Sequence, residues 1–270
     1  MQKLNLFIVM ILCIACSSSK KVTETLDSPM ADFSDNTVIT KSFPLKNAEK
    51  LNANFVGTIH YTQGKHYKCS ASGKSQFINQ LEIYEEGNTL YIKDQSKSKQ
   101  KAKIDIYITT PTLNALYSNG VSNFKAEMPL TLKDITIDNN GVGSVDISEV
   151  TCQTAHINTR GVGSLTMNFK KANSLNANIS GVGNFTCKAN ANTVTVKNSG
   201  VGNVKLDTKS AHTSVSNSGV GNLSLSVDCN NLEVINSSVG SITVSGTADK
   251  VSIKGGGVSR IKTSKLNKGE

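Results

Sequence analysis

The chain has 270 residues, of which 37% are hydrophobic and 18% charged, with 21 glycines, 4 prolines, no tryptophan and a net charge of +9. This length is sufficient for a folded core, and the balance of apolar and charged residues excludes a disordered chain. The few prolines exclude a proline-rich stalk, and glycine does not recur at every third position as collagen requires. Abundant Gly, Ser, Thr, Asn and Val with few aromatic residues favours a repetitive β structure.

The first sixteen residues are typical of an export signal. A lysine near the start precedes an apolar run, residues 4–12, which is too short to span a membrane as a helix. Ala15 stands directly before Cys16, as in the lipobox of bacterial lipoproteins, although Cys13 occupies the place where leucine is usual. This resemblance implies removal of residues 1–15 and acylation of Cys16, with palmitate among the acyl groups. Such chains would hold the protein on a membrane. An ordinary secretory signal and an uncleaved anchor are the alternatives.

Residues 16–40 show neither helical nor strand periodicity, so we expect a flexible tether behind the lipidated cysteine. A flexible coil of this length has an r.m.s. span of roughly 27 Å. The expected location is the cell envelope, lipid-anchored on the outer membrane. The basic pair Lys20 and Lys21 leaves open whether the domain faces the periplasm or the cell surface.

A block with the sequence Gly-Val-Gly-Ser/Asn recurs through residues 120–263, and its copies begin 19 to 21 residues apart. Each copy is followed and preceded by short runs in which apolar and polar residues alternate, which predicts two strands per repeat with one buried face. A constant repeat length then predicts an all-β fold, a right-handed parallel β-helix (β-solenoid) with one coil per repeat and ~4.8 Å between coils. The glycines assigned to the repeat turns are Gly120, Gly141, Gly143, Gly161, Gly163, Gly181, Gly183, Gly200, Gly202, Gly219, Gly221, Gly240 and Gly257.

Each residue type of the block has an expected role. The valine should stack on the valines of neighbouring coils, each burial contributing roughly 1.5–3 kcal/mol. The glycines permit positive φ or a tight corner, and Ser and Asn in register can form hydrogen-bonded ladders between coils. A phosphate-binding interpretation of Gly-x-Gly is disfavoured, since no βαβ unit follows the motif.

Residues 41–119 are expected to start the same solenoid with longer loops. The sequence Phe55-Val56-Gly57 echoes the block, and the 65 residues from Phe55 to Gly120 correspond to about three longer coils. Residues 81–92 predict a β-hairpin. With a polar tail at 264–270, residues 41–263 are predicted to form one domain.

Three features of the sequence occur together: a predicted hairpin in the N-terminal part, the TPTLNAL stretch at residues 110–116, and the Gly-Val-Gly-Ser/Asn repeats behind a lipobox. In this combination the chain resembles the GIN-domain lipoproteins. The resemblance covers roughly residues 37–263. It implies an autotransporter-adhesin head domain with a right-handed β-helix, a cell-envelope location and an adhesive role. It supplies no catalytic residues, because the family has no established biochemical activity.

Four cysteines follow Cys16, and their positions do not favour disulfides. Cys152 and Cys229 lie at similar repeat phases but about 19 Å apart by coil stacking, beyond the ~4.4–6.8 Å that a disulfide tolerates between Cα atoms. Cys187 is predicted to be a core residue, and Cys69 cannot be placed. The four histidines lack metal-ligand spacing, and neither arginine has a column of carboxylates beside it. No catalytic residue, metal or other cofactor is therefore expected.

A candidate binding surface lies in the first half of the chain, where all six tyrosines and the densest lysine cluster fall. Export and the scarcity of arginine argue against nucleic acid as a partner. The lysine cluster is interpreted as a solubilising loop, with an anionic envelope glycan or lipid headgroup as the alternative contact. The candidate residues are Tyr61, Tyr67, Tyr84, Tyr91, Tyr107, Lys93, Lys97, Lys99, Lys101 and Lys103.

The predicted function is that of a membrane-anchored envelope lipoprotein whose rigid β-helix is a non-catalytic adhesion or binding module, with an envelope glycan or protein as partner. A structural or scaffold envelope lipoprotein is the alternative, and a polysaccharide-active β-helix enzyme is a distant third. An open solenoid end presents unpaired strand edges. We therefore expect the last coil to be closed by self-association into a homo-oligomer, or by the polar residues Lys262, Lys265 and Lys268.

Overall fold

The structure is a computed structural model that describes residues 37–95, 104–256 and 258–269. The whole described core lies in the compact unit of residues 35–270. The described residues form nineteen strands and one four-residue helix, α1 (Ser75–Ile78). The lipidation candidate Cys16 and the proposed tether up to residue 36 lie outside the described residues.

The strands are short before residue 160 and long after it, where each covers most of a coil. The short strands are β1 (Val38–Phe43), β2 (Lys50–Asn54), β3 (Val56–Gln63), β4 (Lys68–Lys74), β5 (Leu81–Glu86), β6 (Thr89–Asp94), β7 (Asp105–Thr110), β8 (Ala115–Ser118), β9 (Val121–Ala126), β10 (Leu130–Thr131), β11 (Asp134–Asn139), β12 (Val145–Thr151) and β13 (Thr154–Thr159). The long strands are β14 (Leu165–Ile179), β15 (Phe185–Asn198), β16 (Val204–Asn217), β17 (Leu223–Asn236), β18 (Gly240–Gly255) and β19 (Ser259–Lys268).

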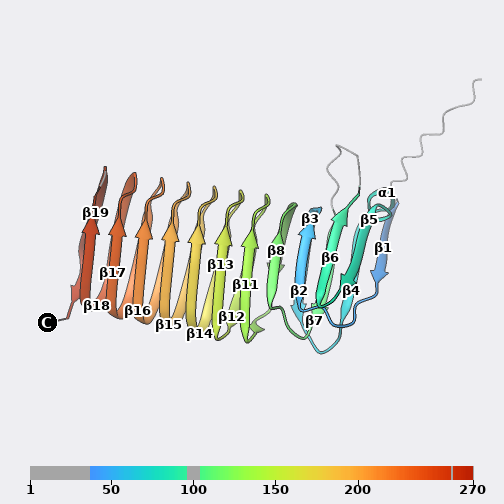
Figure 1. Cartoon of the computed structure of the whole chain (residues 1–270), viewed down its shortest axis with the longest axis horizontal. Helices are drawn as coiled ribbons and strands as arrows, with labels where there is room; N and C mark the ends of the chain where they lie inside the picture. Colours follow the sequence, from blue (N-terminus) through green and yellow to red (C-terminus); the bar gives the residue numbers. More distant parts are fainter. Residues whose placement is uncertain (1–36, 96–103, 257, 270) are drawn as a thin grey trace, which may run out of the picture. The chain divides into compact units, whose positions relative to one another are not determined.

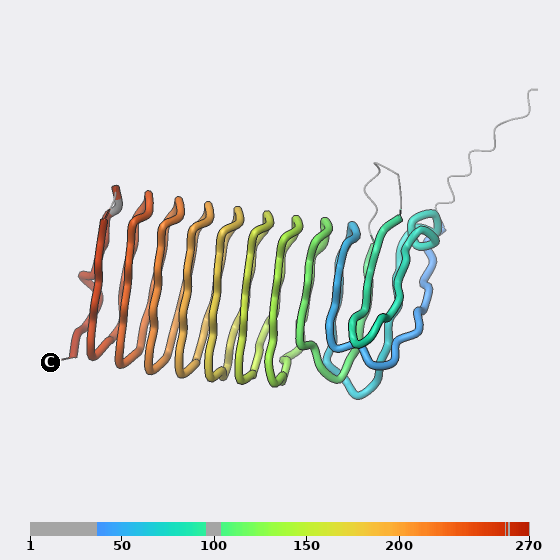
Figure 2. Tube along the Cα trace, in the orientation of Figure 1, coloured from blue at the N-terminus to red at the C-terminus, as the bar shows by residue number. Residues whose placement is uncertain are grey.

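These strands wind into the predicted β-solenoid, whose coils stack side by side (Figures 1 and 2). Each coil contributes one segment to a back face and the next segment to a front face, named as seen in Figure 1. The back face contains β3, β9, β12 and the first halves of β14–β18, and ends in β19. The front face contains β2, β8, β11, β13 and the second halves of β14–β18. The Gly-Val-Gly block forms the corner where the front segment of one coil passes into the back segment of the next, and we call it the GVG corner.

Alternating hydrophobicity produces this winding. Along β17, Leu223, Leu225 and Val227 are buried, while the residue that follows each of them, a serine or an aspartate, is exposed. Neighbouring coils repeat the pattern in register, so that Leu223 pairs with Val204 on one side and Ile242 on the other. The result is a continuous core between the two faces, which includes the large side chains Phe55, Phe169 and Phe185.

Asparagine ladders connect the coils, as predicted. On the outside, Asn203 accepts a hydrogen bond from the Asn222 backbone N–H at 3.2 Å, one coil further on. Inside the corner, Asn198 donates to Asn217 at 2.8 Å and Asn217 donates to Asn236 at 3.2 Å. These side chains satisfy one another where water is excluded, which stabilises the stack.

The order of the first coils differs from the expectation. Val56 pairs with Val121, so the coil of β2 and β3 lies directly against the coil of β8 and β9. The prediction of about three longer coils between Phe55 and Gly120 is therefore wrong. The chain between them leaves the stack, builds an outer coil from β6 and β7 on the far side of β2 and β3, and returns.

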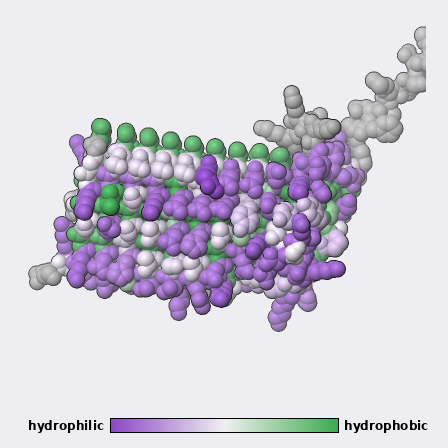
Figure 3. Space-filling model, in the orientation of Figure 1, coloured by the Kyte–Doolittle hydropathy of each residue, from purple (hydrophilic) through white to green (hydrophobic). Residues whose placement is uncertain are grey.

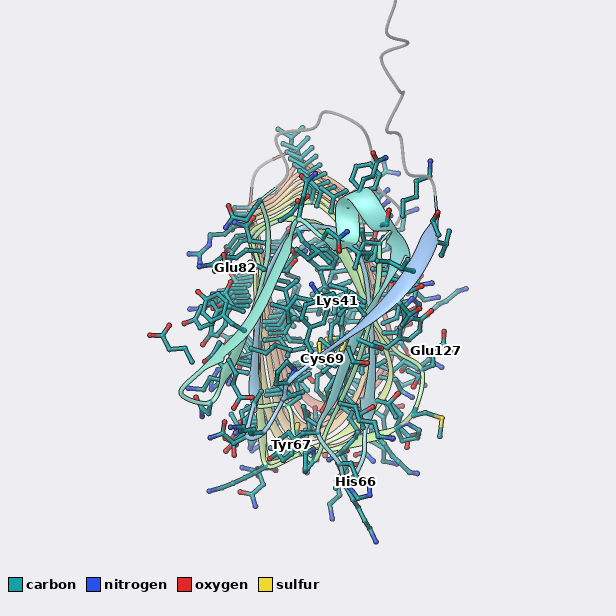
Figure 4. All side chains as sticks on the ribbon, turned by 90° about the vertical axis from the view of Figure 1, so that its right-hand side faces the viewer. Lys41, His66, Tyr67, Cys69, Glu82 and Glu127 are labelled. Atoms are coloured by element: carbon teal, nitrogen blue, oxygen red, sulfur yellow. The ribbon has the colours of Figure 1, made fainter. Side chains whose placement is uncertain are left out.

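Antiparallel strands cover the stack at this first end. β4 pairs with β7 and β1 pairs with β4, while β5 and β6 form the predicted hairpin with Gly87 in its turn. Figure 4 views this end and shows β1 crossing it, with Cys69 behind the strand. Helix α1 adds buried Phe77 and Ile78. This end of the solenoid is therefore closed by strands of the chain itself.

The other end has no such cover among the described residues. β19 pairs with the first half of β18, whereas residues 250–255 in the second half pair with β17 on one side and have no described strand on the other. Ile253 and Ile261 are only partly buried there, while Lys262, Lys265 and Lys268 are exposed. β19 continues to Lys268, so most of the expected polar tail at 264–270 is strand.

Candidate functional site

The repeated valines lie on the outside of the solenoid, and the prediction that they are buried is wrong. Seven of them form consecutive bridges from coil to coil and are each 47–56% exposed. Figure 3 shows the resulting row of hydrophobic side chains along one corner of the solenoid, above a largely hydrophilic face. We call this row the valine ridge, and it consists of Val121, Val142, Val162, Val182, Val201, Val220 and Val239.

The backbone groups of the ridge valines are hydrogen-bonded to neighbouring coils, which leaves their side chains as the groups that face outward. The Val142 N–H donates to the Gly120 carbonyl at 2.8 Å, and the Val162 carbonyl accepts from the Gly143 N–H at 2.8 Å. Corresponding bonds recur along the corner, for example from Val220 to Gly200 at 2.9 Å. A partner at this corner therefore meets isopropyl groups and finds the backbone N–H groups of the valines already paired.

This corner requires the glycines of the block, and five of the seven copies on the ridge contain both of them. Gly183 has φ of 149°, which L side chains rarely adopt, and a Cβ on it would collide with the Gly163 carbonyl of the preceding coil. A Cβ on Gly181 would collide with the Gly161 carbonyl in the same way. The glycines therefore let neighbouring coils approach closely, and Val182 between them is more exposed than either glycine.

The columns that flank the ridge are polar and almost uncharged. The residues one before the first glycine are Asn, Ser or Arg160, and the residues after the second glycine are Asn or Ser. Arg160 is the one charged side chain in these two columns over the seven coils, and it donates to Asn140 at 2.9 Å. The columns consist of Asn119, Asn140, Arg160, Ser180, Ser199, Ser218 and Ser237 on one side and Asn123, Ser144, Ser164, Asn184, Asn203, Asn222 and Ser241 on the other.

The exposed area of the ridge is large enough to hold a partner. Full burial of an exposed valine contributes ~1.5–3 kcal/mol, so covering seven half-exposed ones would contribute on the order of 5–10 kcal/mol. This is comparable with the estimated ~4–15 kcal/mol of lost translational and rotational freedom on association. A scattered exposed valine needs no explanation, but an uninterrupted row of seven is a candidate interaction surface.

The tyrosine and lysine residues predicted as a binding surface are only partly brought together. Tyr84 and Tyr91 stack on the front face with ring centroids 5.2 Å apart. Lys93 lies over both rings and donates a hydrogen bond to the Tyr84 hydroxyl at 2.6 Å. That hydrogen bond raises the pKa of Lys93 above its ordinary value. These three residues form one small aromatic and cationic cluster.

The other predicted members lie elsewhere. Tyr61 is buried and bonded to Thr110 at 2.8 Å, and burial raises its pKa to about 12. Tyr107 lies on the back face, stacked on His60 with ring centroids 4.9 Å apart. Figure 4 places Tyr67 near the corner opposite the ridge. Lys97, Lys99, Lys101 and Lys103 lie outside the described residues. Those members of the predicted surface that lie within the described residues thus do not form one continuous face.

An open groove of about 820 Å³ lies at the corner opposite the ridge. It contains Lys170, which pairs with Glu149 at 3.2 Å, and Lys209, which pairs with Asp228 at 3.1 Å. These exposed ion pairs are individually weak. Within the described residues, no group of three or more His, Cys, Asp or Glu side chains is placed to hold a metal ion.

The four cysteines that the structure describes are free and buried. Burial raises the pKa of Cys69 and of Cys187 to about 12 and that of Cys152 to about 11. The thiolate is the reactive form of cysteine, so these thiols are unreactive at neutral pH. They serve as small core residues.

A sequence signal for the ridge existed. The interior position that follows each block is Phe, Val, Leu or Ile, whereas the second position of the block is valine in every copy. Core positions accept any apolar side chain that fills the space. A position that repeats one small apolar residue between glycines is therefore set by something other than core packing.

No helix among the described residues is long and apolar enough to cross a membrane. No curated protein sequence matches the chain. Solved structures resemble it in fold, among them the following three. A putative adhesin from Bacteroides fragilis NCTC 9343 is 24% identical with a TM-score of 0.62, and covers 84% of this chain and 96% of that one. A putative adhesin from Parabacteroides distasonis ATCC 8503 is 16% identical with a TM-score of 0.60, and the match covers 85% of this chain and 98% of that one.

The third structure, a putative lipid binding protein from Parabacteroides distasonis ATCC 8503, is 17% identical with a TM-score of 0.62, and covers 87% of this chain and 98% of that one. At these identities the likeness shows the fold alone. The sequence family described as "Putative auto-transporter adhesin, head GIN domain" matches residues 49–219 and 191–270. Because these matches span most of the sequence and all the coils of the ridge, the chain belongs to this GIN-domain family.

Proposed function

We propose that this protein is a non-catalytic binding module of the cell envelope, held on a membrane by acyl chains on Cys16, and that it binds its partner through the valine ridge. The observation that carries the proposal is the row of seven half-exposed valines on a solenoid whose remaining surface is mostly polar. A rigid stack holds these side chains in fixed positions, so little conformational entropy is lost when a partner covers them.

Membership of an adhesin-head family supports a binding role at the envelope, and two of the structural neighbours are themselves named putative adhesins. The sequence supports the anchor, because Ala15 and Cys16 follow an apolar run of signal-peptide length. Substituting Cys16→Ser should move the protein from the membrane fraction to the soluble fraction and abolish incorporation of labelled palmitate. Unchanged membrane partition of the variant would contradict the anchoring part of the proposal.

The binding part can be tested with a fragment of residues 35–270, which contains the whole described core. A ridge variant carries Val142→Lys, Val182→Lys and Val220→Lys on alternate coils, so that the new charges do not stack on one another. A control variant carries Gln153→Lys, Asn192→Lys and Asn230→Lys, which places equal charge on the same coils at the opposite corner, where all three side chains are exposed.

The measurement is retention of the labelled fragment on intact cells of the source bacterium, displaced by unlabelled fragment. We expect saturable retention of the wild type and the control variant, and at least tenfold weaker retention of the ridge variant. Equal retention of the ridge variant would remove the ridge from the binding surface. No retention of the wild type would favour the scaffold alternative.

A further inference from the structure

We propose that the valine ridge is covered by the valine ridge of a second copy of this chain. This inference rests on the proposed use of the ridge as a binding surface and names the partner. Four properties of the ridge favour a second copy as its partner: the period of its valines, its shape, its charge and its area.

The first observation is the period of the ridge. Its valines belong to successive coils in parallel register, so they repeat at the strand spacing of ~4.8 Å. A partner whose side chains interdigitate with all seven valines must offer groups at the same spacing along a straight line. Another stack of parallel strands has this property, and a second copy has it over the same number of coils.

The second observation is the shape of the GVG corner. The valines stand between two rows of glycine, such as Gly181 and Gly183 on either side of Val182. A ridge with a groove beside it is complementary to itself, because each of two ridges can lie in the groove beside the other. An open groove of about 450 Å³ borders the ridge near Val121 and Val142, with Asn119 and Asn140 among its lining residues. Such self-complementarity is what a two-fold interface requires.

The third observation is charge. Two molecules of net charge +9 repel each other, so a shared surface must avoid the lysines. The flanking columns contain Arg160 as their one charge, and their Ser and Asn side chains carry both donors and acceptors that can pair across a two-fold axis. A membrane-binding surface would instead have lysines beside the apolar row. The corner therefore fits a second copy better than a lipid surface.

The area agrees with a weak dimer. Seven coils at ~4.8 Å and five residues across the corner at ~3.3 Å give a strip of about 500 Å² per partner. The total of about 1,000 Å² is near the lower limit for a specific interface. We therefore expect a dissociation constant in the micromolar range.

Sedimentation equilibrium of the 35–270 fragment tests the dimer. We expect reversible dimerisation of the wild type and the control variant, and at least 100-fold weaker association of the ridge variant. Circular dichroism and thermal unfolding of all three show whether the variants remain folded. A wild type that stays monomeric up to millimolar concentration would overturn the inference, as would a dimer that the ridge substitutions leave intact.

Cross-linking gives an independent test that does not depend on added charge. Val182→Cys lies at the centre of the ridge and should form an intermolecular disulfide under mild oxidation in either relative orientation of two ridges. Asn192→Cys, on the same coil at the opposite corner, should not. The buried native thiols interfere little, because their pKa values are raised. Equal cross-linking at both positions would contradict the inference.

The outcomes separate this inference from the proposed function. A monomeric wild type that still binds cells through the ridge keeps the function and rejects the second copy as partner. Ridge-dependent binding to phosphatidylglycerol vesicles by a monomeric fragment would identify a lipid surface as the occupant, and would also overturn the inference. A ridge-dependent dimer without cell retention supports the inference and rejects the role as an envelope-binding module.

Discussion

Valine has two environments in this chain, and its hydrophobicity does not distinguish them. Val142 stands half-exposed on the ridge, whereas Val145, three residues later, is 2% exposed in the core. Within a strand the alternation of side chains determines which residues face inward, so the positions after each block were predicted correctly as buried. At the corner the backbone turns, the alternation is interrupted by glycine, and the direction of the side chain depends on the geometry of the turn.

The buried thiols predict a loss of stability at alkaline pH. Burial raises the pKa of Cys69 and of Cys187 from 9.0 to about 12. Below pH 9 the thiols are protonated in both states, and their full contribution to stability is present. Between pH 9 and pH 12 the unfolded state releases protons that the folded state retains, so the free energy of unfolding falls with rising pH.

The measurement compares urea unfolding of the 35–270 fragment with that of its Cys69→Ala and Cys187→Ala double variant, in the presence of a reductant. The variant should start less stable at pH 8. By pH 10.5, however, its free energy of unfolding should have fallen by about 2 kcal/mol less for each thiol removed. Parallel pH curves for the two proteins would show that these thiols do not titrate as described.

At the scale of the element, the coil is the structural unit that the sequence predicts most accurately. A period of 19 to 21 residues sets the pairing register wherever one coil directly follows another, and the observed pairing of β15 with β16 and of β16 with β17 follows that period. The position of β2 and β3 between β6–β7 and β8–β9 could not be predicted. The chain leaves the stack and returns, and no repeat spacing records where it rejoins.

The glycine corner provides a test of how closely the coils approach. Gly183→Ala introduces a Cβ that collides with the Gly163 carbonyl at a φ of 149°. Gly87→Ala is the matched control, because Gly87 also has positive φ, of 60°, but nothing lies within 4 Å of the added Cβ. The control should lose about 1–2 kcal/mol through backbone strain alone.

Gly183→Ala should lose more than about 3 kcal/mol, since the coils must separate or the turn must change. Urea unfolding of the 35–270 fragment measures both changes. Equal losses in the two variants would mean that φ, rather than contact between coils, requires the glycine.

At the scale of the whole described unit, the stack is nearly one-dimensional, and each coil contacts mainly its two neighbours. In this architecture, tyrosines that were predicted from sequence to share one surface lie on different faces. Tyr84 and Tyr107 are near in sequence to the same lysine cluster, but alternate segments of the chain enter opposite faces of the solenoid. Proximity along the chain therefore does not place two side chains on one surface.

The two ends of the stack should also differ in stability, because stability in a stack of repeats is a sum over neighbouring contacts. β6 and β7 are covered by the antiparallel strands β5 and β4, whereas the second half of β18 has a described strand on one side only. Val251 and Ile253 there are partly buried, while the equivalent Leu232 and Val234 of β17 are at most 2% exposed. Backbone amides with fewer partners and less apolar cover open locally at lower free energy.

Hydrogen exchange followed by mass spectrometry should therefore show exchange in residues 250–255 at least 100-fold faster than in residues 231–236, with protection increasing from β18 toward β15. The hairpin of β5 and β6, at the capped end, serves as the comparison and should be more protected than residues 250–255. Uniform protection of the two ends would mean that an interface in solution covers the last coil. Since the ridge lies at a corner and leaves this edge free, that result would point to a contact separate from the ridge dimer.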